Sequence, residues 1–98
     1  MNTTSKQSFD EMTAVLCGIS DPAAMKKLLA ELLTEAELDD LVLRWRLLGL
    51  LADGVPQREI SKKLGISLCK ITRGAKILKN DKSALYSIFM GDDASSRA

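Results

Sequence analysis

Apolar residues recur along most of this chain at intervals of three and four, the spacing that places them on one face of an α-helix. The first such run follows Ser8 and Glu11, which have the spacing of a capping box, and it ends at Gly18. Asp21 and Pro22 then supply a helix cap and a proline at the first helical position. The pattern therefore predicts two helices in the first third of the chain.

The longest helix is predicted at about 35–53, behind a second capping box formed by Thr34 and Glu37. Its apolar residues lie around most of its girth. They are Leu38, Leu41, Val42, Trp45, Leu48 and Leu51 on one face, and Leu43, Leu47 and Leu50 on another. A helix of this kind has to be covered from several sides. In a chain this short, we expect a second subunit to supply part of the cover.

Shorter helices are predicted at 57–64 and at 67–79, separated by Gly65, and a last one from Ala84 to Phe89. No stretch shows the alternation of apolar and polar residues that is typical of a strand. The sequence therefore predicts an all-α fold of six short helices.

The two ends of the chain, residues 1–7 and 91–98, are polar and rich in small residues, so we expect disordered tails around one helical domain at 8–90. A length of 98 residues allows one domain. The N-terminus lacks the apolar core of a signal peptide, and no apolar run approaches the length of a membrane span. These features predict a cytoplasmic protein.

Residues 57–79 have the spacing of a helix-turn-helix. Ser61 is a small residue where the two helices meet, and Gly65, four positions later, tolerates the positive φ that the turn needs. Apolar residues at the buried positions are expected to lock the pair. They are Ile60, Leu64, Ile66 and Ile71. Any two amphipathic helices joined by glycine can share this pattern, with the charged residues merely solvated.

Charge favours the first interpretation. From Arg44 to Lys79 the chain has nine lysines and arginines against two acids, a net charge of +7, whereas the remainder carries −6. Such a basic region is suited to phosphate. The start of the second helix is expected to face the edges of the DNA bases. The lysine and arginine residues around it are expected to contact guanine or phosphate. The candidate DNA contacts are Gln57, Arg58, Ser67, Leu68, Cys69, Lys70, Thr72, Lys76 and Lys79.

Three further residues bear on chemistry. Gly74 occupies a position that is usually apolar in such a helix, which either leaves a cavity for a ligand or allows close packing against another helix. Cys17 and Cys69 lack the spacing of metal ligands, and buried, reduced thiols are the simpler expectation for both. Since the chain contains no histidine, we expect neither a zinc site nor a Cys/His nucleophile, and no enzymatic activity.

The segments LLTEAELDDL, RWRLL and QREISKKLGISLCKITRGAKILK, within about residues 28–80, resemble the tryptophan operon repressor family. The resemblance implies an intertwined helical homodimer that represses transcription. Its two helix-turn-helix units reach successive major grooves of a palindromic operator. It also implies L-tryptophan as a corepressor bound between the core and the reading heads.

The ligand residues of that family correspond here to Thr34, Arg44 and Arg73. In the family, the two arginines flank the indole ring, and the second arginine and the threonine hold the carboxylate. Guanidinium groups stack on rings and bind carboxylates in a fork, which agrees with these roles. Gly74 would permit close approach of the ring, while Ile77 replaces a serine of the family and makes the site more apolar. Alternatively, both arginines are plain surface or phosphate-binding charges.

Two other functions stay open. The turn at 54–56 is one residue shorter than in well-known family members, and together with Ile77 this leaves room for a helix-turn-helix regulator that does not respond to tryptophan. A helical protein-interaction module that never touches DNA is the alternative from another class.

Overall fold

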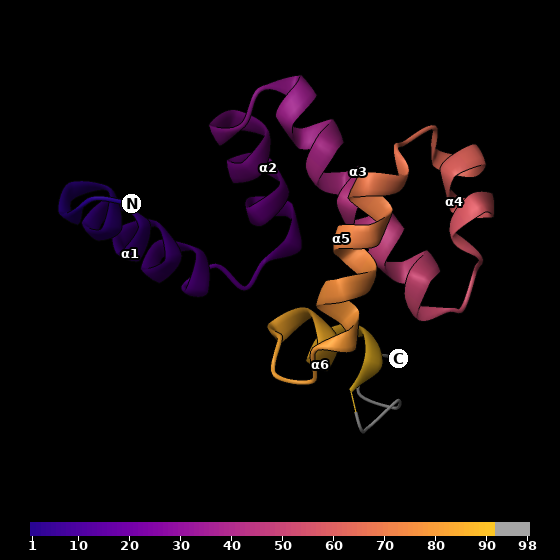
Figure 1. Ribbon diagram of the computed structural model, residues 1–98. Helices are drawn as coiled ribbons and strands as arrows, with labels where there is room; N and C mark the ends of the chain where they lie inside the picture. Colours follow the sequence, from indigo (N-terminus) through magenta and orange to yellow (C-terminus); the bar gives the residue numbers. More distant parts are fainter. Residues whose placement is uncertain (92–98) are drawn as a thin grey trace. The chain divides into compact units, whose positions relative to one another are not determined.

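The structure is a computed structural model that describes residues 1–91. Its helices are α1 (Thr3–Cys17), α2 (Pro22–Leu32), α3 (Glu35–Ala52), α4 (Gln57–Leu64), α5 (Leu68–Lys79) and α6 (Ala84–Met90) (Figure 1). The prediction of six helices and no strand is confirmed for the described residues. Within that range, no helix is both long enough and apolar enough to cross a membrane. The predicted C-terminal tail lies, from residue 92 onward, outside the described residues.

The first helix begins earlier than predicted. The side chain of Asn2 accepts a hydrogen bond from the backbone N–H of Ser5 at 2.8 Å, and α1 starts at Thr3. The prediction that residues 1–7 form a disordered tail is therefore wrong for 3–7, which are helical. Asparagine is a strong N-cap, and it satisfies a first-turn donor before the chain reaches Ser8.

The other predicted caps are formed. Asp21 accepts from the N–H of Ala23, and Pro22 occupies the first turn of α2. At the start of α3 the capping box is reciprocal. The N–H of Thr34 donates to Glu37 Oε1 at 2.8 Å, and the N–H of Glu37 donates to Thr34 Oγ1 at 3.1 Å. These local bonds fix where the helices begin, independently of tertiary packing.

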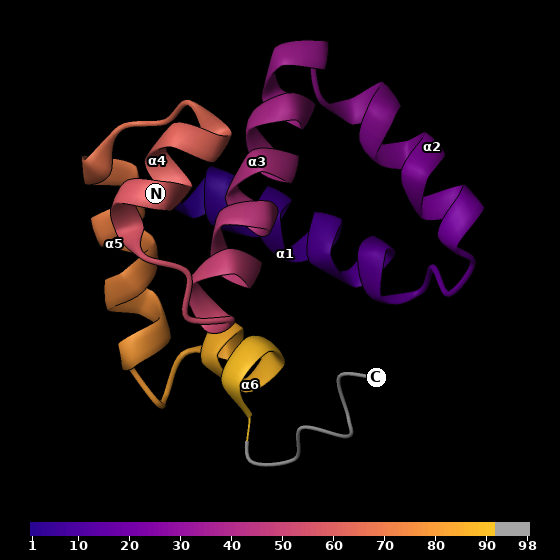
Figure 2. The same ribbon diagram turned by 90° about the vertical axis from the view of Figure 1, so that its right-hand side faces the viewer.

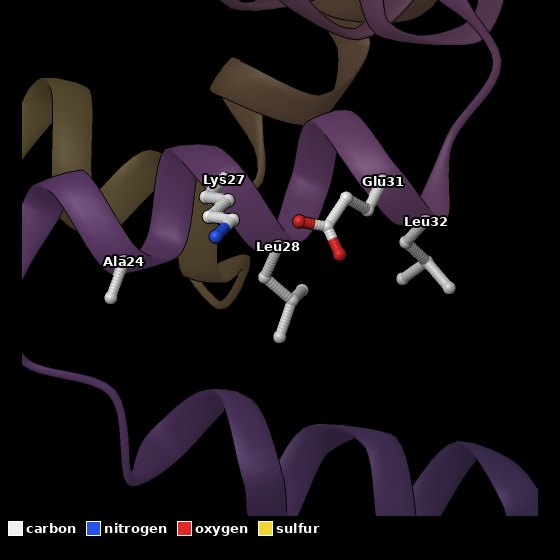
Figure 3. Close-up of a pocket in the computed structure, with 5 residues that line it drawn as sticks. All are labelled: Ala24, Lys27, Leu28, Glu31 and Leu32. Atoms are coloured by element: carbon white, nitrogen blue, oxygen red, sulfur yellow. The ribbon is translucent and has the colours of Figure 1, made fainter.

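The chain divides into two compact units. The first comprises Met1–Leu38, and no residue of α1 or α2 is buried. A shallow pocket lies on α2, and Figure 3 shows the side chains of Ala24, Leu28 and Leu32 projecting from the same side of that helix, beside Lys27 and Glu31. The apolar face of α2 is thus formed but not buried within the chain.

The second unit begins at Asp39 and contains the core. Its helices α4, α5 and α6 gather around the second half of α3 (Figure 2). Two clusters of buried side chains hold them there. One consists of Leu47, Ile60 and Ile71, and the other of Leu48, Leu78 and Phe89. α3 and α5 each contribute to both clusters, so the two helices meet at Leu47 and Ile71 and again at Leu48 and Leu78.

Candidate nucleic-acid interface

The turn between α4 and α5 is built around a left-handed glycine. Gly65 ends α4 in the left-handed conformation, at φ 64° and ψ 36°, and its N–H donates to the carbonyl of Ser61. Only glycine adopts this conformation without strain. Ser67 then caps α5 by accepting from the N–H of Lys70. The predicted role of Gly65 is confirmed.

The predicted apolar lock is also present. Ile60 and Ile71 are completely buried, and they pack together with Leu47 of α3. Leu64 and Ile66 are partly buried against the same cluster. Burial of each such side chain contributes about 1.5–3 kcal/mol, so these contacts fix the angle between α4 and α5.

Two serine hydroxyls reinforce α5 at its ends. Ser61 Oγ donates to the carbonyl of Ile66 at 2.8 Å, across the turn from α4. At the other end, Ser83 Oγ donates to the carbonyl of Ile77 at 3.0 Å and accepts from the N–H of Tyr86 at 2.9 Å, which joins α5 to α6. The sequence required only a small residue at position 61, and neither side-chain bond was predicted.

All nine predicted DNA contacts are exposed. Those on α5 lie on a helix with no acidic residue, and Leu68, at its first position, is 52% exposed. Lys62, which is not among the predicted contacts, is also exposed, one turn after Arg58 on the same face of α4. The helix pair thus presents mainly basic and small side chains to solvent, together with Leu68 and one acid, Glu59.

The predicted ligand residues are distributed over both units. Thr34 is exposed in the first unit, where its hydroxyl oxygen caps α3. In the second unit, Arg44 on α3 and Arg73 on α5 are exposed, and Ile77 is half-buried.

Gly74 is buried against α3. A Cβ atom at this position would lie 3.1 Å from Leu51 Cδ1 and 3.4 Å from Leu47 Cδ2. Of the two explanations left open by the sequence, the structure therefore supports close helix packing rather than a cavity on that side of the glycine.

The prediction of buried cysteines is wrong. Cys17 and Cys69 are both free and exposed. Cys69 follows Leu68 in the first turn of α5, where the neighbouring residues face away from the core, and this explains its exposure. Among residues 1–91, no group of three or more potential ligands is arranged to hold a metal ion.

Comparison with known proteins agrees with this geometry. The family model described as Trp repressor protein matches residues 7–91. A Trp operon repressor homolog of Xylella fastidiosa (strain M23) is 39% identical over 77 residues, covering 78% of this chain and 84% of that protein. One from Chlamydia caviae is 39% identical over 66 residues, covering 65% of each. No solved structure gives a significant match.

The family match extends over all six helices apart from the first turns of α1. It includes the helix pair with its left-handed glycine and its basic residues. Proteins of this family are regulators and not enzymes. The chain therefore belongs to the Trp repressor family and is a transcription regulator.

Proposed function

We propose that this protein is a repressor that binds a palindromic DNA operator as a homodimer, with L-tryptophan as corepressor. The observation that carries the proposal is the α4–α5 pair, in which a left-handed glycine turn and a buried apolar lock support an exposed, acid-free helix. The names of the relatives, Trp operon repressor homologs, support the same regulatory role.

In this proposal α5 enters the major groove by its N-terminal end. Leu68, Cys69, Lys70 and Thr72 face base edges, and Ser67 approaches the backbone at the helix start. Gln57 and Arg58, in the first turn of α4, reach a base or a phosphate. Farther along α5, Lys76 and Lys79 contact phosphates, as does Lys62 on α4. Phosphate contacts of this kind set the affinity and its salt dependence.

A second copy of the chain is proposed because the apolar faces of the N-terminal helices are not buried. The large exposed apolar side chains on α1, α2 and α3 are Phe9, Met12, Val15, Leu32, Leu41, Val42 and Trp45. A symmetric pair that intertwines these helices would bury them. It would also present two copies of α5, which matches a palindrome with half-sites about 34 Å apart.

The corepressor site is proposed to contain Arg44 and Arg73, whose guanidinium groups stack on the indole ring, with Thr34 and Arg73 at the carboxylate. Ile77 supplies an apolar wall. Gly74 acts indirectly, because its packing on α3 fixes the stretch of α5 from which Arg73 extends. The ligand favours repression only through its higher affinity for the conformation that fits DNA.

The test is selection of bound duplexes from a random DNA pool, with and without L-tryptophan. We expect a two-fold symmetric motif that is recovered efficiently only with the amino acid. Recovery of the same motif without any tryptophan effect would favour a regulator that does not respond to tryptophan. Absence of any selected duplex at low salt, where phosphate contacts are strongest, would favour a protein-interaction module.

A further inference from the structure

The start of α5 carries an apolar side chain that no part of the core uses. Leu68 is the first residue of the helix, is 52% exposed and belongs to neither buried cluster. The isoleucines and the other leucine of α5 behave differently, because Ile71 and Leu78 are buried and Ile77 is half-buried. About half of the surface of Leu68 is therefore available to a partner.

The residue one turn later has little hydrogen-bonding capacity left. Thr72 Oγ1 donates its proton to the carbonyl of Leu68 at 2.8 Å, within the helix. A hydroxyl has one proton, so Thr72 offers a base only its methyl group and oxygen lone pairs. Between them in sequence, Cys69 is exposed, and a thiol is a weak donor. This surface is therefore better suited to contacts with methyl groups than to directional hydrogen bonds.

The surroundings of this apolar surface define its partner. The same helix carries four basic residues and no acidic residue. The basic residues are Lys70, Arg73, Lys76 and Lys79. An apolar protein surface would not require so much positive charge, whereas DNA combines phosphate with one apolar feature on the floor of the major groove. That feature is the C5-methyl group of thymine.

We propose that Leu68, supported by Thr72, reads thymine C5-methyl groups in each half-site, so that operator specificity depends on them at the positions facing the start of α5. The inference rests on the proposed DNA binding and adds the chemistry by which α5 selects a sequence. Leu68 is thereby a specificity-determining residue.

The test uses the duplex obtained by selection and replaces one thymine at a time by deoxyuridine, which removes only the methyl group. For at least one position in each half-site, we expect the affinity of the unaltered protein to fall about fourfold, the factor that corresponds to burial of one methyl-sized group. Leu68→Ala is expected to bind the thymine duplex less tightly. It should bind the thymine and deoxyuridine duplexes with nearly equal affinity.

Lys76→Ala is the matched control on the same helix. It should weaken binding to all duplexes and reduce the salt slope by about 1, while it keeps the discrimination between thymine and deoxyuridine. Leu68→Ile, which retains the apolar side chain, should keep the discrimination as well. Because Leu68 is exposed, these variants are expected to fold like the unaltered protein, and circular dichroism checks this.

Two results would overturn the inference while leaving DNA binding intact. One is that no thymine replacement changes the affinity of the unaltered protein. The other is that Leu68→Ala remains as sensitive to the replacement as the unaltered protein. If selection yields no preferred duplex at all, the proposed function itself is wrong, and the inference falls with it.

Discussion

Arg73 and Gly74 are neighbours on α5, but their environments are different. Successive helical residues point about 100° apart, and here the direction of Gly74 meets Leu47 and Leu51 of α3 while Arg73 is exposed. The missing side chain of the glycine allows α5 to lie close to α3. That contact fixes the backbone from which Arg73 extends, so a change at either residue is expected to act through a different property of the protein.

Arg73→Lys tests the ligand role at this position. Lysine keeps the positive charge but cannot stack on a ring or hold a carboxylate in a fork. Loss of such charge-assisted bonds is expected to weaken L-tryptophan binding about 10- to 100-fold. Titration calorimetry measures this, and DNA binding without tryptophan should change little. If the variant binds tryptophan like the unaltered protein, Arg73 is a surface or phosphate-binding charge.

The packing of Gly74 is tested by a matched pair of glycine substitutions in helix interiors. At Gly49 of α3 a Cβ atom would lie 3.8 Å from the Phe89 ring, an ordinary contact, whereas at Gly74 it would lie 3.1 Å from Leu51 Cδ1. We expect Gly49→Ala to raise the free energy of unfolding by about 0.5–1 kcal/mol. Gly74→Ala should raise the free energy of unfolding by less than this or lower it, because Leu51 must shift. Equal gains in urea unfolding would contradict this account.

Glu37 makes the stability of the first unit dependent on pH. The N–H of Thr34 donates a hydrogen bond to the carboxylate of Glu37, and a side-chain hydrogen bond with Thr34 adds to it. Together these bonds lower the pKa of Glu37. Because this pKa is lower in the folded state, ionised Glu37 stabilises the fold at pH values above the ordinary glutamate pKa of about 4.3. The stabilisation is lost as pH falls through the folded-state pKa.

We therefore expect Glu37→Gln to lower the thermal midpoint at neutral pH and to have a smaller effect in acid. Thermal unfolding followed by circular dichroism between neutral and acidic pH measures the difference. Glu35→Gln removes one charge from the same helical turn and serves as the control. The interpretation fails if the two variants show the same dependence on pH.

At the scale of the elements, a serine side chain donates a hydrogen bond to the backbone near each end of α5. Near its start, Ser61 of α4 donates to the carbonyl of Ile66, and near its end, Ser83 donates to that of Ile77. The two apolar clusters lie along the same helix, one containing Ile71 and the other Leu78. These contacts hold α5 against its neighbouring helices, so we expect it to keep its orientation when it binds the proposed operator.

Ser61→Ala tests whether the hydroxyl positions the helix pair. It leaves the carbonyl of Ile66 without this donor, and we expect a loss of about 1 kcal/mol in the free energy of unfolding. A positioning role further predicts that affinity for the selected operator falls more than affinity for random duplexes, measured at one salt concentration. Ser61→Thr keeps the hydroxyl and should restore most of the ratio between the affinity for the operator and the affinity for random duplexes. A uniform loss on all duplexes would indicate a purely structural role.

The sequence predicted those elements whose signals are local. The bounds of α4 agree with the prediction, and α5 starts directly after its predicted cap, because Gly65 and Ser67 act within a few residues of the chain. The start of α1 was misplaced because Asn2 and Ser8 are both acceptable N-caps, and the sequence pattern does not show which of the two caps the helix. The packing of Gly74 on Leu47 and Leu51 depends on residues brought together only by folding. The bond from Ser61 to Ile66 is local, but it depends on the direction in which the turn at Gly65 leads the chain.

At the scale of the whole molecule, the distribution of apolar surface is uneven. All buried apolar residues of the described chain lie in the second unit, from Leu47 to Phe89, whereas no residue of α1 or α2 is buried. A chain of 98 residues has a small core at best, and helices with unburied apolar faces are marginal in water. The N-terminal helices are therefore expected to gain most of their stability from association with another chain.

Val42→Glu tests the proposed association between two copies. Val42 is 51% exposed on α3, so the charge is tolerated in a lone chain but not in an apolar interface. For the unaltered protein, stability should rise by about 1.4 kcal/mol for each tenfold increase in chain concentration. Val42→Glu should sediment as a monomer and lose this dependence. Lys82→Glu, which also introduces an exposed acid, should keep both the dimer and the dependence. An unfolding midpoint independent of concentration in the unaltered protein would exclude a dimer stabilised in this way.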